Sequence, residues 1–163
     1  MHASPPVDSQ QQDTYFIVAH IHYVLFGGAI VGIFSGLYYW FPKMTWKMMN
    51  ETLGLTHFAL SFIFFNAAFY PMHNVGISGM PRRYATYDPA LTEMNQFITV
   101  TAIIFGLAQL IFVYNVWYSY RNGEEAGDDP WNGWSLEWAT SSPPPHNSFT
   151  EIPTLKLAEE EAE

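Results

Sequence analysis

The sequence predicts an all-α integral membrane fold with three transmembrane helices and an irregular C-terminal tail. Of the 163 residues, 49% are hydrophobic, 18% aromatic and only 13% charged, whereas an ordinary soluble domain carries about 25% charged residues. The charges gather at the two ends and in two loops. Between them lie three apolar blocks that contain no Asp, Glu, Lys or Arg. A helix formed by such a block can cross the apolar layer of a bilayer.

The first predicted span covers residues 15–41 and follows a leader of residues 1–14. As a helix this block is roughly 40 Å long, which is enough to cross a bilayer with some tilt. Pro42 is expected to end it, because proline lacks a backbone N–H and its ring clashes with the preceding turn. Four glycines in the block, at positions 27, 28, 32 and 36, favour close approach of neighbouring helices.

The second predicted span covers residues 53–72 and is short but adequate, with Pro71 expected to interrupt its helix. A loop of residues 73–92 follows. It ends in Asp88 and Pro89, residue types that are typical of a helix start.

The third predicted span covers residues 93–120, and its central part from residue 97 carries no charge. Residues 121–163 form the tail, which contains many of the acidic residues behind the net charge of −9. We interpret this acidity as a solvated segment. Residues 1–6 lack the basic and apolar regions of a secretory signal, so insertion is expected to depend on the spans themselves.

Three spans place the leader and the 73–92 loop on one side of the membrane, and the tail on the other. Basic residues outside the spans number two on the first side and four on the second: Arg82 and Arg83, against Lys43, Lys47, Arg121 and Lys156. Because cytoplasmic segments carry the excess of Lys and Arg, the tail is expected on the cytoplasmic or matrix side. The leader and the arginine pair are then on the outer side.

Two histidines lie within the first span. Ionisable side chains inside a membrane mark a functional site by default, and the chain has no Cys that could bind a metal. At about 100° per residue, His20 and His22 leave the helix roughly 200° apart, so they cannot share one metal ion. They need two partners. The alternative is that each imidazole only bonds a carbonyl of a neighbouring helix.

Arg82 and Arg83 form an adjacent basic pair that opposes the charge bias of the predicted topology. Guanidinium groups bind carboxylates and phosphates in bidentate geometry. Contact with lipid headgroups is the alternative. Together with two imidazoles in the membrane, the pair is consistent with two porphyrins whose iron is bound by His and whose propionates meet Arg.

The segment DTYFIVAHIHYVL, residues 13–25, resembles the D-T-Y-x-V-V-A-H-F-H-Y-V-L signature of haem-copper oxidase subunit I, in the tenth helix of that fold. Further resemblances cover most of residues 1–153: WFPK (40–43), HF (57–58), GMPRRY (79–84), DPW (129–131), SLEW (135–138) and PPP (143–145). The resemblance implies that the three spans are part of a twelve-helix core, as its helices 10, 11 and 12.

The resemblance implies a role for each candidate. His20 would be the axial ligand of the high-spin haem, where oxygen is reduced, and His22 an axial ligand of the low-spin haem. The implied partners of the haem propionates are Arg82 and Arg83, with Asp8 near those of the high-spin haem and Tyr15 beside the low-spin haem. The haems are expected to be haem A, as a and a3.

Two positions depart from the family pattern. Ile21 stands where the family usually has Phe, which removes an aromatic ring between the haem ligands without affecting ligation. Gln12 precedes Asp13 where the family has His-Asp. The carboxylate of an outer magnesium site is kept and its neighbouring imidazole is lost, which puts magnesium binding in doubt.

Three other features have structural interpretations. His57 and His73 are expected to be hydrogen-bonding residues and not metal ligands. Trp131, Trp134 and Trp138, with the triple proline, predict an extended segment that packs on the inner face of the complex, because such a stretch cannot be helical.

The resemblance implies an oxidoreductase that works only within a complex, reducing oxygen to water with electrons from cytochrome c and pumping protons. The first nine helices, with the copper B site, would belong to a separate chain or to the rest of a longer one. Oxidase subunits II and III and membrane lipid are the expected partners, and nucleic acid is not. A bacterial or archaeal plasma membrane is preferred to the mitochondrial inner membrane. A quinol oxidase, and a non-catalytic bis-haem carrier or assembly protein, remain as alternatives.

Overall fold

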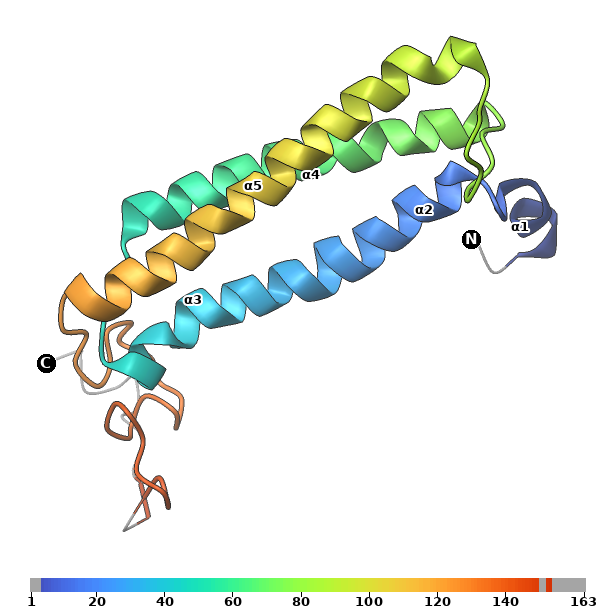
Figure 1. Cartoon of the computed structure of the whole chain (residues 1–163). Helices are drawn as coiled ribbons and strands as arrows, with labels where there is room; N and C mark the ends of the chain where they lie inside the picture. The colour runs from blue at the N-terminus through green and yellow to red at the C-terminus, as the bar shows by residue number, and fades with distance from the viewer. Residues whose placement is uncertain (1–3, 150–151, 154–163) are drawn as a thin grey trace, which may run out of the picture.

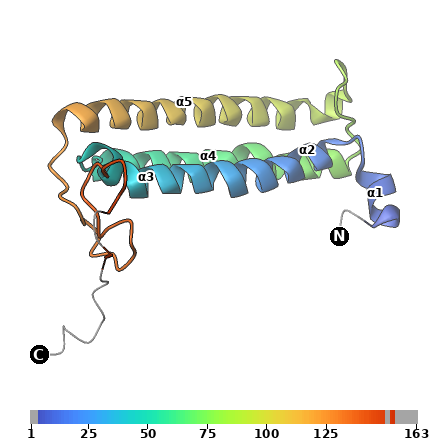
Figure 2. The ribbon, with the colours of Figure 1, turned by 90° about the horizontal axis from the view of Figure 1, so that it is seen from below.

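The computed structural model describes residues 4–149 and 152–153. Its main elements are three long helical segments that run side by side (Figures 1 and 2). The first segment joins α2 (Tyr15–Ile21), a π-helical segment η1 (His22–Ile30) and α3 (Val31–Thr45); the second is α4 (Glu51–Ile77); the third joins the 3-10 turn η2 (Pro89–Leu91) and α5 (Thr92–Asn122). A short helix, α1 (Pro5–Gln11), precedes them. Within the described residues the chain forms helices and no strand, and all three segments are long and apolar enough to cross a membrane. The predicted fold class is confirmed.

The prolines do not end the first two spans, so that part of the prediction was wrong. The first helix continues through Pro42 to Thr45, and the second through Pro71 to Ile77. Each proline removes one backbone hydrogen bond, but a long membrane helix tolerates this where neighbouring groups satisfy the freed carbonyl. As a result, residues 73–77, predicted as loop, are helical.

The two ends of the bundle have different contents (Figure 1). One end holds α1 and the connection between α4 and α5, which carries Arg82 and Arg83. We call this the α1 end. The other, the tail end, holds the 46–50 connection and the residues after α5. The leader and the arginine loop therefore share an end, as three spans require. Residues 154–163, with Lys156 and the terminal acidic run, lie outside the described residues.

Helix α4 is the centre of the packing, because α5 and the first segment both lie against it. A buried aromatic cluster forms around Phe65 and Phe69 of α4 and Phe105 of α5, with Tyr23 and Phe26 of η1 packed against it. On the opposite face of α5, apolar side chains such as Val100, Ile103 and Leu107 are more than half exposed. This face is suited to contact with lipid or with further apolar helices.

A glycine allows the closest approach between the first segment and α4. A Cβ atom at Gly76 would collide with the backbone nitrogen of Phe16, and would lie 2.7 Å from the Cα and Cβ atoms of Phe16. Since real Cβ atoms do not approach backbone so closely, only glycine fits here. Gly76 thereby sets the position of the start of α2.

A buried polar cluster joins α4 and α5 at the tail end. The side chain of Asn115, which has no exposed surface, accepts from the backbone N–H of Asn50 at 3.2 Å and donates to the Asn50 carbonyl at 3.0 Å. Ser119 donates to Asn115 at 2.9 Å and accepts from the Asn50 N–H. The Asn50 side chain in turn caps α4 through the Leu53 N–H. The cluster fixes where α4 begins.

We expect Asn115→Ala to lower the thermal stability of the purified protein, because it removes the amide that bonds Asn50 and leaves the buried Ser119 hydroxyl without its acceptor. A buried unsatisfied polar group costs about 1–3 kcal/mol. The matched control is Asn122→Ala, because Asn122 is exposed and donates only to a carbonyl of its own helix. Thermal denaturation in detergent measures both variants. Equal melting temperatures for the two would contradict the role of the cluster.

The segment after α5 is irregular but anchored to the end of α3. The Lys43 ammonium group is buried and donates to the carbonyls of Asp128, at 2.9 Å, and Thr140, at 2.7 Å. Trp131 donates to the Tyr39 carbonyl, and the buried Trp138 donates to the Tyr39 hydroxyl. Trp131 and Trp138 thus anchor the segment to α3, while its packing on the inner face of a complex stays a prediction. By contrast, 57% of Trp134 is exposed.

Candidate functional site

His22 is held in an orientation and a tautomer that suit a metal ligand. Its Nδ1 lies 2.7 Å from the Val18 carbonyl oxygen, one turn earlier. A carbonyl only accepts, so Nδ1 carries the proton, and in the neutral ring Nε2 keeps its lone pair. The ring also stacks on Phe69 of α4, with centroids 4.4 Å apart and an interplanar angle of 16°. Metal-binding histidines typically donate a hydrogen bond from one ring nitrogen, often to a backbone carbonyl, and bind the metal with the other.

His20 lies on a different face of the same helix. Residues 15–21 are regular α-helix, and Ala19, the residue before His20, is fully buried. His22 is one turn after Ala19 and packs on α4, whereas His20 points about 200° away from His22. His20 is partly buried. The two imidazoles therefore leave the helix on different faces, and that they serve two partners stays a prediction.

Sequence reasoning did not predict the π-helical segment that begins at His22 and ends at Ile30. A π-helix places one extra residue in each turn, is rare, and is frequently found at functional sites. Apart from the adjacent Gly27 and Gly28, the segment has no composition that distinguishes it from an α-helix. The wider turns carry Tyr23 and Phe26, which pack on the buried aromatic cluster around Phe65.

At the α1 end, the arginine loop is paired with the start of α2. The Tyr15 N–H donates to the Met80 carbonyl at 3.1 Å, and the Arg82 N–H donates to the Asp13 carbonyl at 2.8 Å. Between these two bonds, Thr14 and Pro81 form an isolated antiparallel bridge. This backbone pairing, between residues 13–15 and 80–82, places Arg82 beside Asp13, two residues before α2 begins at Tyr15.

The other candidate residues lie at the same end. Tyr15 packs against the buried cluster of Val75, Met80 and Ile98. Asp8 is partly buried in the first turn of α1. Arg83 is exposed and has a φ of 68°, a left-handed conformation that is uncommon for a residue with a long side chain. Arg82 is thus attached directly to the start of α2, Arg83 follows it in the chain, Tyr15 is the first residue of α2, and Asp8 lies in α1 at the same end.

Asp13, the candidate magnesium ligand, is already paired with Arg82. Magnesium prefers oxygen ligands in octahedral geometry, and the candidate carboxylate oxygen, Asp13 Oδ1, instead accepts from Arg82 at 2.9 Å (Nε) and 2.8 Å (Nη2). A bound guanidinium opposes a second cation at the same oxygen. In the part of the chain that the structure describes, no three His, Cys, Asp or Glu side chains are grouped so as to hold a metal ion.

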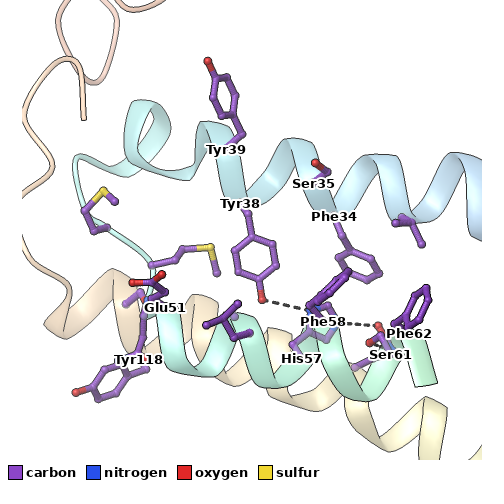
Figure 3. A pocket seen from close by; sticks show the side chains of 18 of the residues that line it. Phe34, Ser35, Tyr38, Tyr39, Glu51, His57, Phe58, Ser61, Phe62 and Tyr118 are labelled. Carbon is purple, nitrogen blue, oxygen red and sulfur yellow. Dashed lines mark hydrogen bonds between the residues drawn. The ribbon is translucent and has the colours of Figure 1, made fainter. Parts of the chain in front are cut away.

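His57 is a hydrogen-bonding residue, as the sequence predicts. It is buried, its Nδ1 lies 3.2 Å from the Tyr38 hydroxyl, and its Nε2 lies 3.1 Å from Gln109 Oε1. Gln109 also donates to Ser61 at 3.0 Å. Because Tyr38, His57 and Gln109 belong to α3, α4 and α5, the imidazole links the three spans. Figure 3 shows the bond to Tyr38 at the side of a groove of about 1290 Å³, lined mainly by apolar side chains.

His73 has a similar structural role near the other end of α4. Its Nδ1 lies 3.2 Å from the Tyr70 carbonyl, within the same helix. Its ring packs against Phe16 in an edge-to-face contact with centroids 4.9 Å apart, and against Tyr23 at 5.6 Å. It therefore packs between α4 and the first segment, and is not grouped with other metal-ligating side chains of the described residues.

Fold and site together define a helical membrane protein whose first span carries two imidazoles on different faces, with an arginine fixed at the start of the same helix. The sequence profile of the family described as Cytochrome C and Quinol oxidase polypeptide I matches residues 1–112. The chain belongs to this family. The resemblance in the signature segment is therefore confirmed.

Individual relatives extend the similarity over most of the chain. The cytochrome c oxidase subunit 1 of Thermostichus vulcanus is 46% identical over 92% of this chain. The putative cytochrome c oxidase subunit 1-beta of Streptomyces coelicolor is 49% identical over 94%, and the cytochrome c oxidase subunit 1 of Corynebacterium diphtheriae 49% identical over 96%. The matched segment is only 27–28% of the length of these curated relatives.

Proposed function

We propose that this chain supplies the axial histidines of two haems in the catalytic core of a terminal oxidase. His20 binds the iron of the high-spin haem and His22 that of the low-spin haem. The observation that carries the proposal is the His22 ring, whose Nδ1 is bonded to the Val18 carbonyl while Nε2 keeps its lone pair. His73 also bonds a carbonyl of its own helix through Nδ1, so the proposal rests in addition on the position of His22 in the signature segment and on its stacking against Phe69.

The residues of this chain fit haem at both positions. Two imidazoles on different faces can each reach one porphyrin, and the Phe69 ring holds the plane of His22. Bound haem iron supplies electron transfer and oxygen reduction, while the protein supplies orientation and electrostatics. The helix between the two ligands then fixes the separation of the haems. Haem A, as a and a3, is the proposed form.

Four further residues of the α1 end serve the haems. Arg82 and Arg83 are proposed to bind propionates, since guanidinium groups pair well with carboxylates. Asp8 lies near the propionates of the high-spin haem, and Tyr15 borders the low-spin haem. The backbone pairing of residues 13–15 with 80–82 supports this arrangement, because it holds Arg82 beside the helix that carries both ligands.

The rest of the catalytic machinery lies outside these three spans. We propose that nine further helices hold copper B, that subunits II and III complete the enzyme, and that the chain is inactive alone. Cytochrome c is the proposed electron donor, because the relatives described above are named cytochrome c oxidases. Quinol remains the second candidate, since the family description includes both donors.

The proposed location is a bacterial plasma membrane, because the named relatives are bacterial and three helices are long and apolar enough to cross it. The tail end faces the cytoplasm on the charge bias of the loops. The complete complex couples oxygen reduction to proton translocation.

The first test is a reduced-minus-oxidised spectrum and a CO-difference spectrum of the complex purified from native membranes, with mass spectrometry of every copurifying chain. We expect two haem signals, of which one responds to CO, and copper-site histidines in the sequence that accompanies this one. A preparation without haem and without such histidines would contradict the proposal, and would favour an assembly protein.

A further inference from the structure

A salt bridge joins the start of α2 to the arginine loop. Arg82 donates through Nε and Nη2 to Oδ1 of Asp13, at 2.9 and 2.8 Å. Of the Arg82 side chain 30% is exposed, and of the Asp13 side chain 73%. Such an exposed pair contributes little to stability. Within this chain the pair therefore matters more for where it places the guanidinium than for folding.

The backbone holds both partners in position before the side chains meet. The Arg82 N–H donates to the Asp13 carbonyl. In the same antiparallel pairing, the Tyr15 N–H donates to the Met80 carbonyl. Asp13 has a φ of 58°, the left-handed conformation that Asp adopts more readily than most residues. The backbone therefore fixes the Asp13 carboxylate opposite Arg82. Because its partner is already in place, the long Arg82 side chain loses less rotamer freedom when the pair forms.

The same contact conflicts with the use of Asp13 as a metal ligand. Its Oδ1 is occupied by the guanidinium, and the neighbouring position is Gln12, whose amide is a neutral and weaker ligand than an imidazole or a carboxylate. A divalent cation at Asp13 would lie next to the positive charge of Arg82, which opposes its binding. One positive charge already neutralises this carboxylate.

We infer that Asp13 is a positioning residue, whose carboxylate orients Arg82 and balances its charge in the place where a magnesium ion would otherwise lie. The inference deepens the proposed function and rests on it, because the orientation matters if Arg82 meets a haem propionate. Arg82 is then shared between a carboxylate of the protein and one of the cofactor.

The charges give the sign of the expected effects. Reduction of haem iron removes one positive charge, so a more positive surrounding favours the reduced state and raises the midpoint potential. Asp13→Asn leaves Arg82 without its counter-charge, and we expect the potential of one haem to rise. Arg82→Gln should lower it, and Asp13→Glu should move it back toward the wild-type value. Asp88→Asn is the matched control, since it removes the same charge at the same end, where Asp88 caps the 3-10 turn η2 through the Ala90 N–H rather than pairing with Arg82.

The experiment is a redox titration of the haems in the complete purified complex, for the wild type and these four variants. Metal analysis and manganese EPR, after growth with manganese as a magnesium substitute, are run on the same samples. We expect the wild type to hold no stoichiometric manganese bound through the Asp13 carboxylate. A wild type without stoichiometric manganese supports the inference even if Asp13→Asn assembles poorly.

The outcomes separate the inference from the proposed function. If Arg82→Gln shifts the potential while Asp13→Asn behaves like Asp88→Asn, the positioning role is wrong and the haem role of Arg82 stands. Stoichiometric manganese that is lost in Asp13→Asn would also overturn the inference, because Asp13 would then be a metal ligand. Unchanged potentials in Arg82→Gln would instead remove the proposed role of Arg82 itself, and the inference with it.

Discussion

His20→Ala is expected to abolish the CO-difference spectrum while the low-spin haem band remains, and His22→Ala is expected to do the reverse. The reason is geometric: the two imidazoles leave the helix about 200° apart, so each serves a separate iron. The structure adds that His22 packs on Phe69 of α4, whereas His20 lies on another face. Optical spectra of the purified complex measure both effects.

The matched control is His73→Ala, which removes an imidazole that bonds a carbonyl of its own helix. We expect it to keep both haem signals. If His20→Ala and His22→Ala lose the same signal, the assignment of two haems to this helix is wrong. If His73→Ala loses the low-spin band as completely as His22→Ala, the band reports general packing and not ligation.

Gly76→Ala is expected to cause a large structural defect at the contact between α4 and the start of α2. Its Cβ would collide with the Phe16 backbone, which cannot rotate away as a side chain would. Overpacking of this kind typically costs about 1–3 kcal/mol and shifts the backbone. The start of α2 would move, and with it the backbone pairing that holds Arg82. Haem content and thermal denaturation of the purified complex measure the result.

Gly106→Ala provides the control, because a Cβ at that position meets nothing within 4 Å. In a helix the change from Gly to Ala is favourable by roughly 0.5–1 kcal/mol. We therefore expect Gly106→Ala to be neutral or stabilising, and Gly76→Ala to lower both the melting temperature and the haem content. Equal behaviour of the two variants would show that the approach of α2 to α4 is not tight in the assembled protein.

The helix boundaries show how far sequence patterns reach. Composition located the three spans, since an uncharged run of about 20 apolar residues has the length and hydropathy that a bilayer-crossing helix needs. It failed at Pro42 and Pro71, where the helices continue to Thr45 and Ile77. The rule that proline ends a helix describes water-exposed helices. In an apolar bundle, ending a helix exposes more unpaired backbone than one proline does.

Some of the site residues could likewise be predicted from the sequence, and others could not. The signature around His20 and His22, and the Arg82–Arg83 pair, could be found in the sequence because each is local. Spacing alone also predicted that the two imidazoles diverge. It did not predict the π-helical segment, which differs from an α-helix in its hydrogen bonds and not in its composition. Nor could it find Asn115 or Gln109, which are single polar residues in an apolar block.

The sequence by itself determined what is local: three membrane spans, two ionisable groups within the first, and the family to which the chain belongs. Only the tertiary structure decided which groups meet, because those contacts join residues far apart in the chain. Asp13 meets Arg82 and His57 meets Gln109 across 69 and 52 positions. Such pairs depend on the register in which helices pack, and that register is set by many small contacts such as Gly76 against Phe16.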